Sequence, residues 1–95
     1  MDRINEIYNA VLDGNAPASK AGVEAALGEG IAPEVILKQG LISAMGEVGR
    51  LFEANEYFVP EMLVSARAMQ GGLALLKPHL AEAGATPAGK EGGAR

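Results

Sequence analysis

The chain contains no cysteine, and its aromatic residues are limited to two tyrosines and two phenylalanines among 95 residues. The absence of cysteine excludes disulfides, zinc thiolates and a thiol nucleophile, and it favours a reducing compartment. The N-terminus carries charges at Asp2, Arg3 and Glu6, and no later run approaches the roughly 20 apolar residues that span a bilayer. We therefore expect a soluble cytoplasmic protein with no membrane partner.

Basic residues are few and scattered. The formal net charge is −4, and the eight Lys and Arg residues are spread over the whole sequence. Nucleic-acid binding requires a basic patch that neutralises phosphates, and no such stripe is present. We therefore expect no nucleic-acid partner.

The sequence also shows no catalytic group and no metal site. His79 is the only histidine and lies near the end of an expected helix, which favours a surface or helix-terminal role over metal ligation. Ser65 has no partner base in the sequence. The carboxylates of Glu53, Glu56 and Glu61 flank a turn and a helix start, where capping and solubility explain them. The chain is not expected to be catalytic by itself.

Small aliphatic residues dominate what is present. Apolar residues make up 48% of the chain and are mostly Ala, Leu, Val and Ile, a composition that suits close packing of helix against helix. A chain of this length suffices for one small domain. We predict an all-α fold, a four- to five-helix antiparallel bundle over residues 1–82, followed by a flexible linker or tail over residues 83–95.

Two short helices are predicted in the N-terminal third. Asp2 can cap the first helix, which Gly14 and Asn15 end. Its apolar stripe consists of Ile4, Ile7, Val11 and Leu12. Pro17 suits the first turn of the second helix, which ends at residues 28–30. Because its apolar residues are few, this second helix is expected to be peripheral.

A third, longer helix is predicted after Pro33. Its apolar face contains Ile36, Leu37, Leu41, Met45, Val48 and Phe52. Gly40, Gly46 and Gly49 interrupt it, and each is expected where another backbone approaches closely or where the helix bends. We predict a bend or break near Gly40.

The last helix is predicted to follow a turn over residues 54–56. Asn55 suits a left-handed conformation in that turn, and Pro60 suits the first turn of the helix. The buried seam of this helix is predicted to consist of Leu63, Ala66, Met69, Leu73, Leu76 and Leu80. Pro78 is expected to kink or fray its end.

Three of the four aromatic residues gather around this turn. Phe52 ends one helix, Val59 begins the next, and Met62 lies one turn further, so these three residues can share one apolar patch. Aromatic residues and Met at helical spacing usually belong to a core. Periodicity alone therefore favours a patch that merely closes the end of the bundle.

The segment from Val48 to Met69 resembles the helical cap of cobalamin-binding proteins. Such caps occur in the corrinoid proteins of methyltransferase systems and in cobalamin-dependent methionine synthase. The pattern in this chain is Val48-Gly49, Leu51-Phe52, a short polar turn, Phe58-Val59-Pro60 and an Ala-rich helix carrying Met69. The resemblance covers approximately residues 1–82 and implies a cap fold.

The resemblance also implies a role for the patch. It implies that Phe52, Val59 and Met62 face the upper side of the corrin ring and shield methylcobalamin from water and oxygen during methyl transfer. In light-sensing relatives a Trp stands at the position of Phe52 and a Glu-His pair at the positions of Met62 and Leu63. This departure favours a methyl carrier over a photoreceptor.

The family implies partners as well. The corrinoid is held mainly by a Rossmann-like domain with an Asp-x-His-x-x-Gly motif, and this motif is absent from the sequence. Expected partners are that domain and the substrate-specific and acceptor methyltransferases. The alternative is a non-catalytic helical interaction or dimerisation module that does not contact corrinoid and uses the same patch to bind a partner helix or a second copy.

Overall fold

The computed structural model describes residues 3–82, and the regular elements within them are all helical. They are α1 (Arg3–Leu12), α2 (Ala16–Gly28), α3 (Pro33–Val35), the π-helical segment η1 (Ile36–Ile42), α4 (Ser43–Glu53) and α5 (Val59–Glu82). Because α3, η1 and α4 follow one another without a break, the described chain forms four helical stretches, which confirms the all-α prediction. The predicted cap at Asp2 and the tail over residues 83–95 lie outside the described residues.

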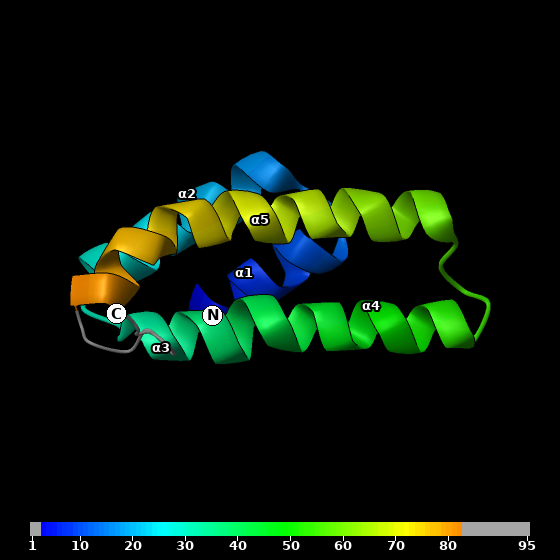
Figure 1. The fold of residues 1–95 in the computed structure, drawn as a ribbon, viewed down its shortest axis with the longest axis horizontal. Coiled ribbons are helices and arrows are strands. Elements are labelled where there is room, and N and C mark those ends of the chain that lie inside the picture. The colour runs from blue at the N-terminus through cyan, green and yellow to red at the C-terminus, as the bar shows by residue number, and fades with distance from the viewer. Residues whose placement is uncertain (1–2, 83–95) are drawn as a thin grey trace, which may run out of the picture.

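The two longest stretches lie side by side in opposite directions. Figure 1 shows α5 running back along η1 and α4, with α1 and α2 packed against this pair on the side away from the α4–α5 turn. The end of the pair where α4 turns into α5 extends beyond α1 and α2. The core lies where the four stretches meet, and it consists of Ile7, Val11, Val23, Ala26, Ile36, Leu41, Ala44, Ala68, Leu76 and Leu80.

Each of α1, α2 and α4 is followed by a residue in the left-handed conformation. These residues are Gly14, Gly30 and Asn55, with φ of 72°, 84° and 66°. In the turn after α4, Asn55 N donates to Phe52 O at 3.1 Å and Glu56 N donates to Leu51 O at 2.9 Å. This pair of bonds is the Schellman arrangement, which satisfies carbonyl groups that the helix itself leaves free. The predicted conformation of Asn55 is therefore confirmed.

Helix α2 is not peripheral, so that prediction was wrong. Val23 and Ala26 are fully buried, and Ser19 and Gly22 are buried with them. A methyl group at Gly72 of α5 would lie 2.9 Å from Ser19 Oγ and 3.1 Å from Val23 Cγ2, so the two helices approach closely. Small residues allow this close packing without large apolar side chains, and apolar content alone therefore underestimates the burial of α2.

Small residues also form much of the buried side of α5. The buried residues of this helix are Ser65, Ala68, Gly72, Leu76 and Leu80. The predicted seam is correct at Leu76 and Leu80 and wrong at Leu63, whose exposed fraction is 58%. The other members of that seam are half-buried, namely Ala66, Met69 and Leu73. The helix continues through Pro78, and Figure 1 shows its last turns bending, as expected of a proline in a helix.

The stretch from α3 to α4 remains helical and is irregular around Gly40. The predicted bend or break takes the form of the π-helical segment η1. A methyl group at Gly40 would lie 3.1 Å from Ile7 Cγ2, so the close approach expected of this glycine is confirmed. At Gly46 and Gly49 a methyl group would meet nothing within 4 Å. The expectation of a close approach was wrong there because this side of α4 faces open space.

We predict that Gly72→Ala lowers the free energy of unfolding by about 1–2 kcal/mol, since the cost of overpacking exceeds the gain in helix propensity. The added methyl group must displace Ser19 and Val23 on α2 and also Leu41, whose Cδ2 would lie 3.2 Å away. Gly46→Ala is the matched control and should raise the free energy by up to about 1 kcal/mol, because it adds helix propensity without a neighbour. Urea denaturation measures the free energy of unfolding of both variants. A Gly72→Ala variant that is more stable than the wild type would contradict the close contact.

Candidate functional site

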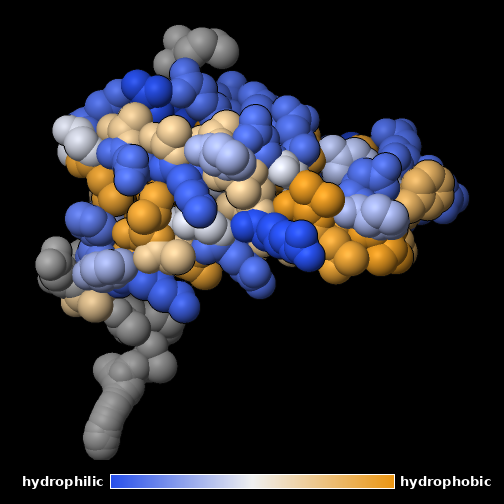
Figure 2. All heavy atoms as spheres, turned by 90° about the horizontal axis from the view of Figure 1, so that it is seen from above, coloured by the Kyte–Doolittle hydropathy of each residue, from blue (hydrophilic) through white to orange (hydrophobic). Residues whose placement is uncertain are grey.

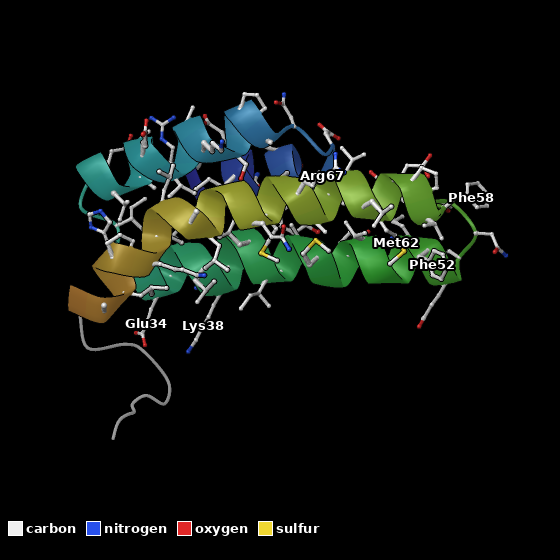
Figure 3. The ribbon with its side chains drawn as sticks, turned by 45° about the horizontal axis from the view of Figure 1, so that its top comes forward. Glu34, Lys38, Phe52, Phe58, Met62 and Arg67 are labelled. Carbon is white, nitrogen blue, oxygen red and sulfur yellow. The ribbon has the colours of Figure 1, made fainter. Side chains whose placement is uncertain are left out.

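Large apolar side chains are exposed where α4 turns into α5. The exposed fractions are 41% for Phe52, 58% for Phe58, 56% for Val59 and 58% for Leu63, and Met62 is half-buried among them. We call these five residues the apolar corner. Figure 2 shows hydrophobic side chains gathered at this projecting end of the molecule, and Figure 3 shows Phe52, Phe58 and Met62 together there. Such side chains are available to a ligand or partner.

The three residues named from the sequence, Phe52, Val59 and Met62, all belong to this corner. Their exposure is not what a patch that merely closes the bundle core would have, because Phe52 and Val59 are 41% and 56% exposed. Phe58 and Leu63 are additional members that were not predicted. Leu63 follows Val59 by four residues on the same helix, and this spacing could have identified it.

Hydrogen bonds hold the backbone of the corner in place. The carbonyl of Leu51 accepts from Glu56 N at 2.9 Å and from Tyr57 N at 3.1 Å. The N–H of Phe58 donates to Glu61 Oε1 at 2.8 Å, as in half of a capping box, which confirms the capping role expected of this glutamate. The exposed apolar side chains are thus carried by an ordered turn.

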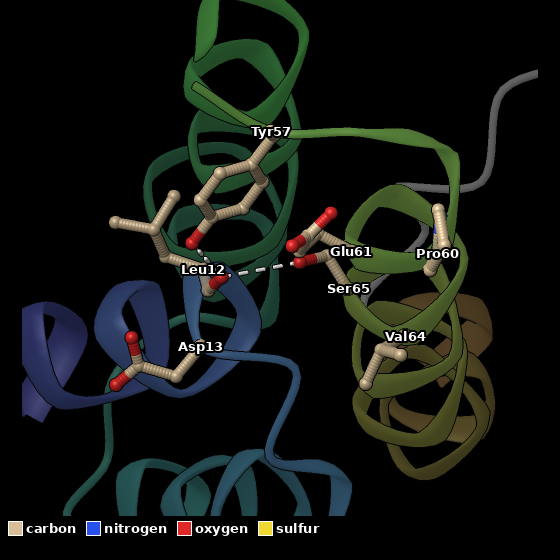
Figure 4. Close-up of a pocket in the computed structure, with 7 residues that line it drawn as sticks. All are labelled: Leu12, Asp13, Tyr57, Pro60, Glu61, Val64 and Ser65. Atoms are coloured by element: carbon tan, nitrogen blue, oxygen red, sulfur yellow. Dashed lines mark hydrogen bonds between the residues drawn. The ribbon is translucent and has the colours of Figure 1, made fainter. Parts of the chain in front are cut away.

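A small cavity of about 220 Å³ lies between this turn and the carboxyl end of α1. Its lining residues are Leu12, Asp13, Tyr57, Pro60, Glu61, Val64 and Ser65. The carbonyl of Leu12 accepts two hydrogen bonds there, from Tyr57 Oη at 2.7 Å and from Ser65 Oγ at 3.1 Å (Figure 4). Both bonds join the start of α5 and the turn before it to α1.

The environment of Tyr57 keeps its phenol protonated. Burial raises the pKa of Tyr57 above its ordinary value, and the negative charges of Asp13 and Glu61 raise it further. All three causes disfavour the phenolate. The hydroxyl therefore remains a hydrogen-bond donor to Leu12 throughout the neutral pH range.

Possible metal ligands do not cluster in the described part of the chain. Within residues 3–82, no cluster of His, Asp and Glu side chains could hold a metal ion, and no helix is long and apolar enough to cross a membrane. His79 is exposed near the far end of α5, on the order of 25 Å from Met62 along the helix axis. This histidine therefore cannot act at the apolar corner.

Comparison with known proteins identifies the family. Residues 3–77 match the family model described as B12 binding domain. The chain belongs to this family. The B12-binding domain is 37% identical over 83 residues to dimethylamine corrinoid protein 1 of Methanosarcina acetivorans, which covers 87% of this chain and 38% of that protein. A corrinoid protein of Desulfitobacterium hafniense is 30% identical over 84 residues, or 88% of this chain and 39% of that protein.

Two solved structures share the fold of this B12-binding domain. The monomethylamine corrinoid protein of Methanosarcina barkeri matches with a TM-score of 0.75 and 31% identity, over 78% of this chain and 35% of that one. The methanol:cobalamin methyltransferase complex of Methanosarcina barkeri matches with a TM-score of 0.78 and 31% identity, over 90% and 32%. The chain thus spans about a third of the length of these relatives.

We predict a loss of stability at alkaline pH that depends on Tyr57. Because the pKa of Tyr57 is higher in the folded state, its stabilising effect is complete below the unfolded value of about 10 and is lost as pH rises through the folded value. Urea denaturation between pH 7 and 11 should show this loss in the wild type and in Tyr8→Phe, but not in Tyr57→Phe. At pH 7, Tyr57→Phe should cost about 1 kcal/mol. An alkaline loss of equal size in Tyr57→Phe would contradict the assignment.

Proposed function

We propose that the chain is the helical cap of a corrinoid methyl carrier and that Phe52, Val59 and Met62 cover the upper face of methylcobalamin. The observation that carries the proposal is the exposure of large apolar side chains on an ordered turn of a B12-binding domain. A small domain that leaves Phe52, Phe58, Val59 and Leu63 in contact with water is expected to cover them with a partner surface.

The side chains of the corner fit a covering role. They offer hydrocarbon and one thioether, which suit contact with a methyl group and with the rim of a macrocycle, and they include no strong cobalt ligand. Gly49 lies three residues before Phe52 and Gly46 three residues before that, so they follow one side of α4, and a methyl group at either position would meet nothing within 4 Å. At these two positions no side chain fills the space beside α4, which favours the approach of a flat ring.

The residues of the chain would act by excluding water. Methylcobalamin, when bound, supplies the methyl group that is transferred. Phe52, Val59 and Met62 would keep water and oxygen away from that group until the cap moves aside. No acid, base or nucleophile of this chain is required for this role, so the chain contributes shielding to the methyltransferase system and not bond chemistry.

Ligation of the cofactor is assigned to residues outside this chain. A Rossmann-like domain with an Asp-x-His-x-x-Gly motif would hold the corrinoid, and this motif does not occur in the sequence. The remaining partners would be a substrate-specific and an acceptor methyltransferase. The relatives named for dimethylamine and monomethylamine and the methanol:cobalamin complex support this class of partner.

We predict that Phe52→Ala and Met62→Ala shorten the lifetime of Co(I) when the chain is combined with the corrinoid domain of a relative. Loss of the Phe52 ring removes roughly 1 kcal/mol of apolar contact from the closed cap, so oxidation should be about fivefold faster. The decay of the Co(I) absorption under a fixed oxygen concentration measures this rate.

Ile31→Ala provides the control for that experiment. Ile31 is half-buried in the connection between α2 and α3, so its truncation affects packing without touching the corner. Wild-type lifetimes in both corner variants would overturn the proposal. Sedimentation at several concentrations tests the alternative. A dimer that buries the corner and does not change when corrinoid is added would instead favour the interaction module.

A further inference from the structure

At the carboxyl end of α1, one carbonyl group accepts no hydrogen bond from the backbone of the following turn. Of the last four carbonyls of this helix, Asn9 O, Ala10 O and Val11 O accept the N–H groups of Asp13, Asn15 and Gly14 at 2.8 to 2.9 Å. Only Leu12 O receives no backbone donor from the turn that follows. Because this helix end is partly buried, the Leu12 carbonyl needs a hydrogen-bond partner, which a side chain or water can supply.

Two hydroxyl groups from distant parts of the chain supply that partner. Tyr57 Oη lies 2.7 Å from Leu12 O, across 45 residues of sequence, and Ser65 Oγ lies 3.1 Å from it, across 53 residues. Ser65 is 1% exposed, so its hydroxyl has little access to water as an alternative partner. Carbonyls at a helix carboxyl end carry partial negative charge, which favours hydrogen-bond donors at this position.

We propose that the hydroxyl groups of Tyr57 and Ser65 are positioning groups that fix the apolar corner relative to α1. Tyr57 belongs to the turn that carries Phe58 and Val59, and Ser65 lies two residues after Leu63. The corner extends beyond α1 and α2, so few other contacts restrain it (Figure 1). The shared carbonyl of Leu12 joins this projecting part to the body of the domain (Figure 4).

A second contact also connects α5 to the end of α1. Gly14 follows α1 with φ of 72°, and a side chain there would collide with Val64 of α5. The turn after α1 therefore rests directly on α5, one residue from Ser65. The contact limits sliding of α5 along α1, and the two hydroxyl bonds determine where the turn before α5 lies.

The consequence for function rests on the proposed cap role. A corner joined to α1 would move with the whole domain when the cap closes or opens, and it would not open separately as a loop. Phe52, Val59 and Met62 would then meet the corrinoid in one fixed arrangement. Loss of the hydroxyls would leave the corner present but mobile, which reduces shielding without removing any covering side chain.

Amide hydrogen exchange on the 95-residue chain tests the proposal without any cofactor. The reporters at the corner are the amides of Glu56, Tyr57 and Met62, which bond to Leu51 O or Phe58 O. The reporters of the body are the amides of Val23 and Leu41. The variants are Tyr57→Phe, Ser65→Ala and the double variant, and the matched controls are Tyr8→Phe and Ser43→Ala.

We expect Tyr57→Phe and Ser65→Ala each to speed exchange at the corner roughly threefold, and the double variant roughly tenfold, with the body amides unchanged. The control variants should leave both sets of amides as in the wild type. Unchanged exchange at the corner, or an equal increase at the corner and in the body, would overturn the positioning role. If the double variant does not fold, Tyr57→Phe alone decides, because it removes one oxygen atom and no packing.

The two proposals fail separately. Faster exchange at the corner together with wild-type Co(I) lifetimes in both Phe52→Ala and Met62→Ala would retain the positioning role and remove the cap role. Wild-type amide exchange at the corner of Tyr57→Phe, together with a shortened Co(I) lifetime in Phe52→Ala, would remove the positioning role and retain the cap role. If both hold, the double variant should oxidise faster than the wild type while keeping Phe52, Val59 and Met62.

Discussion

Close contact between α2 and α5 determines how the core of this domain is packed. Gly72 brings α5 so near to α2 that an added methyl group would lie 2.9 Å from Ser19 Oγ. A helix that packs this closely must present small residues to its neighbour, and α5 presents Ala68 and Gly72. The amino end of α5 extends beyond α1 and α2, so its larger apolar side chains, such as Leu63, remain on the outside.

The corner combines exposed hydrocarbon with a well-bonded backbone. The Schellman turn after α4 and the Glu61 carboxylate satisfy polar groups of the turn within the turn itself. The Leu12 carbonyl then connects it to α1 through Tyr57 and Ser65. An ordered apolar surface suits a ligand that must be covered in one orientation and then released, which is the demand that a methylated corrinoid makes of a cap.

Local signals in the sequence predicted much of the fold, and contacts between distant segments explain the remainder. The all-α class, the left-handed Asn55 and the helix start near Pro60 depend on neighbouring residues alone, and the structure confirms them. The burial of α2 and the exposure of Leu63 depend on which helices meet; the low apolar content of α2 and the periodicity of α5 therefore gave wrong predictions for them. The bond from Tyr57 to Leu12 spans 45 residues and leaves no local pattern.

The proposed cap role requires that the apolar corner contacts the corrinoid. Methyl NMR of the labelled chain, combined with a relative's corrinoid domain loaded with methylcobalamin, tests it most directly. If the corner covers the corrinoid, the methyl groups of Val59, Met62 and Leu63 should show large chemical-shift changes, and those of Leu27 and Ile31 at the other end should show none. Shifts confined to Leu27 and Ile31, or no shifts in a complex that forms, would contradict it.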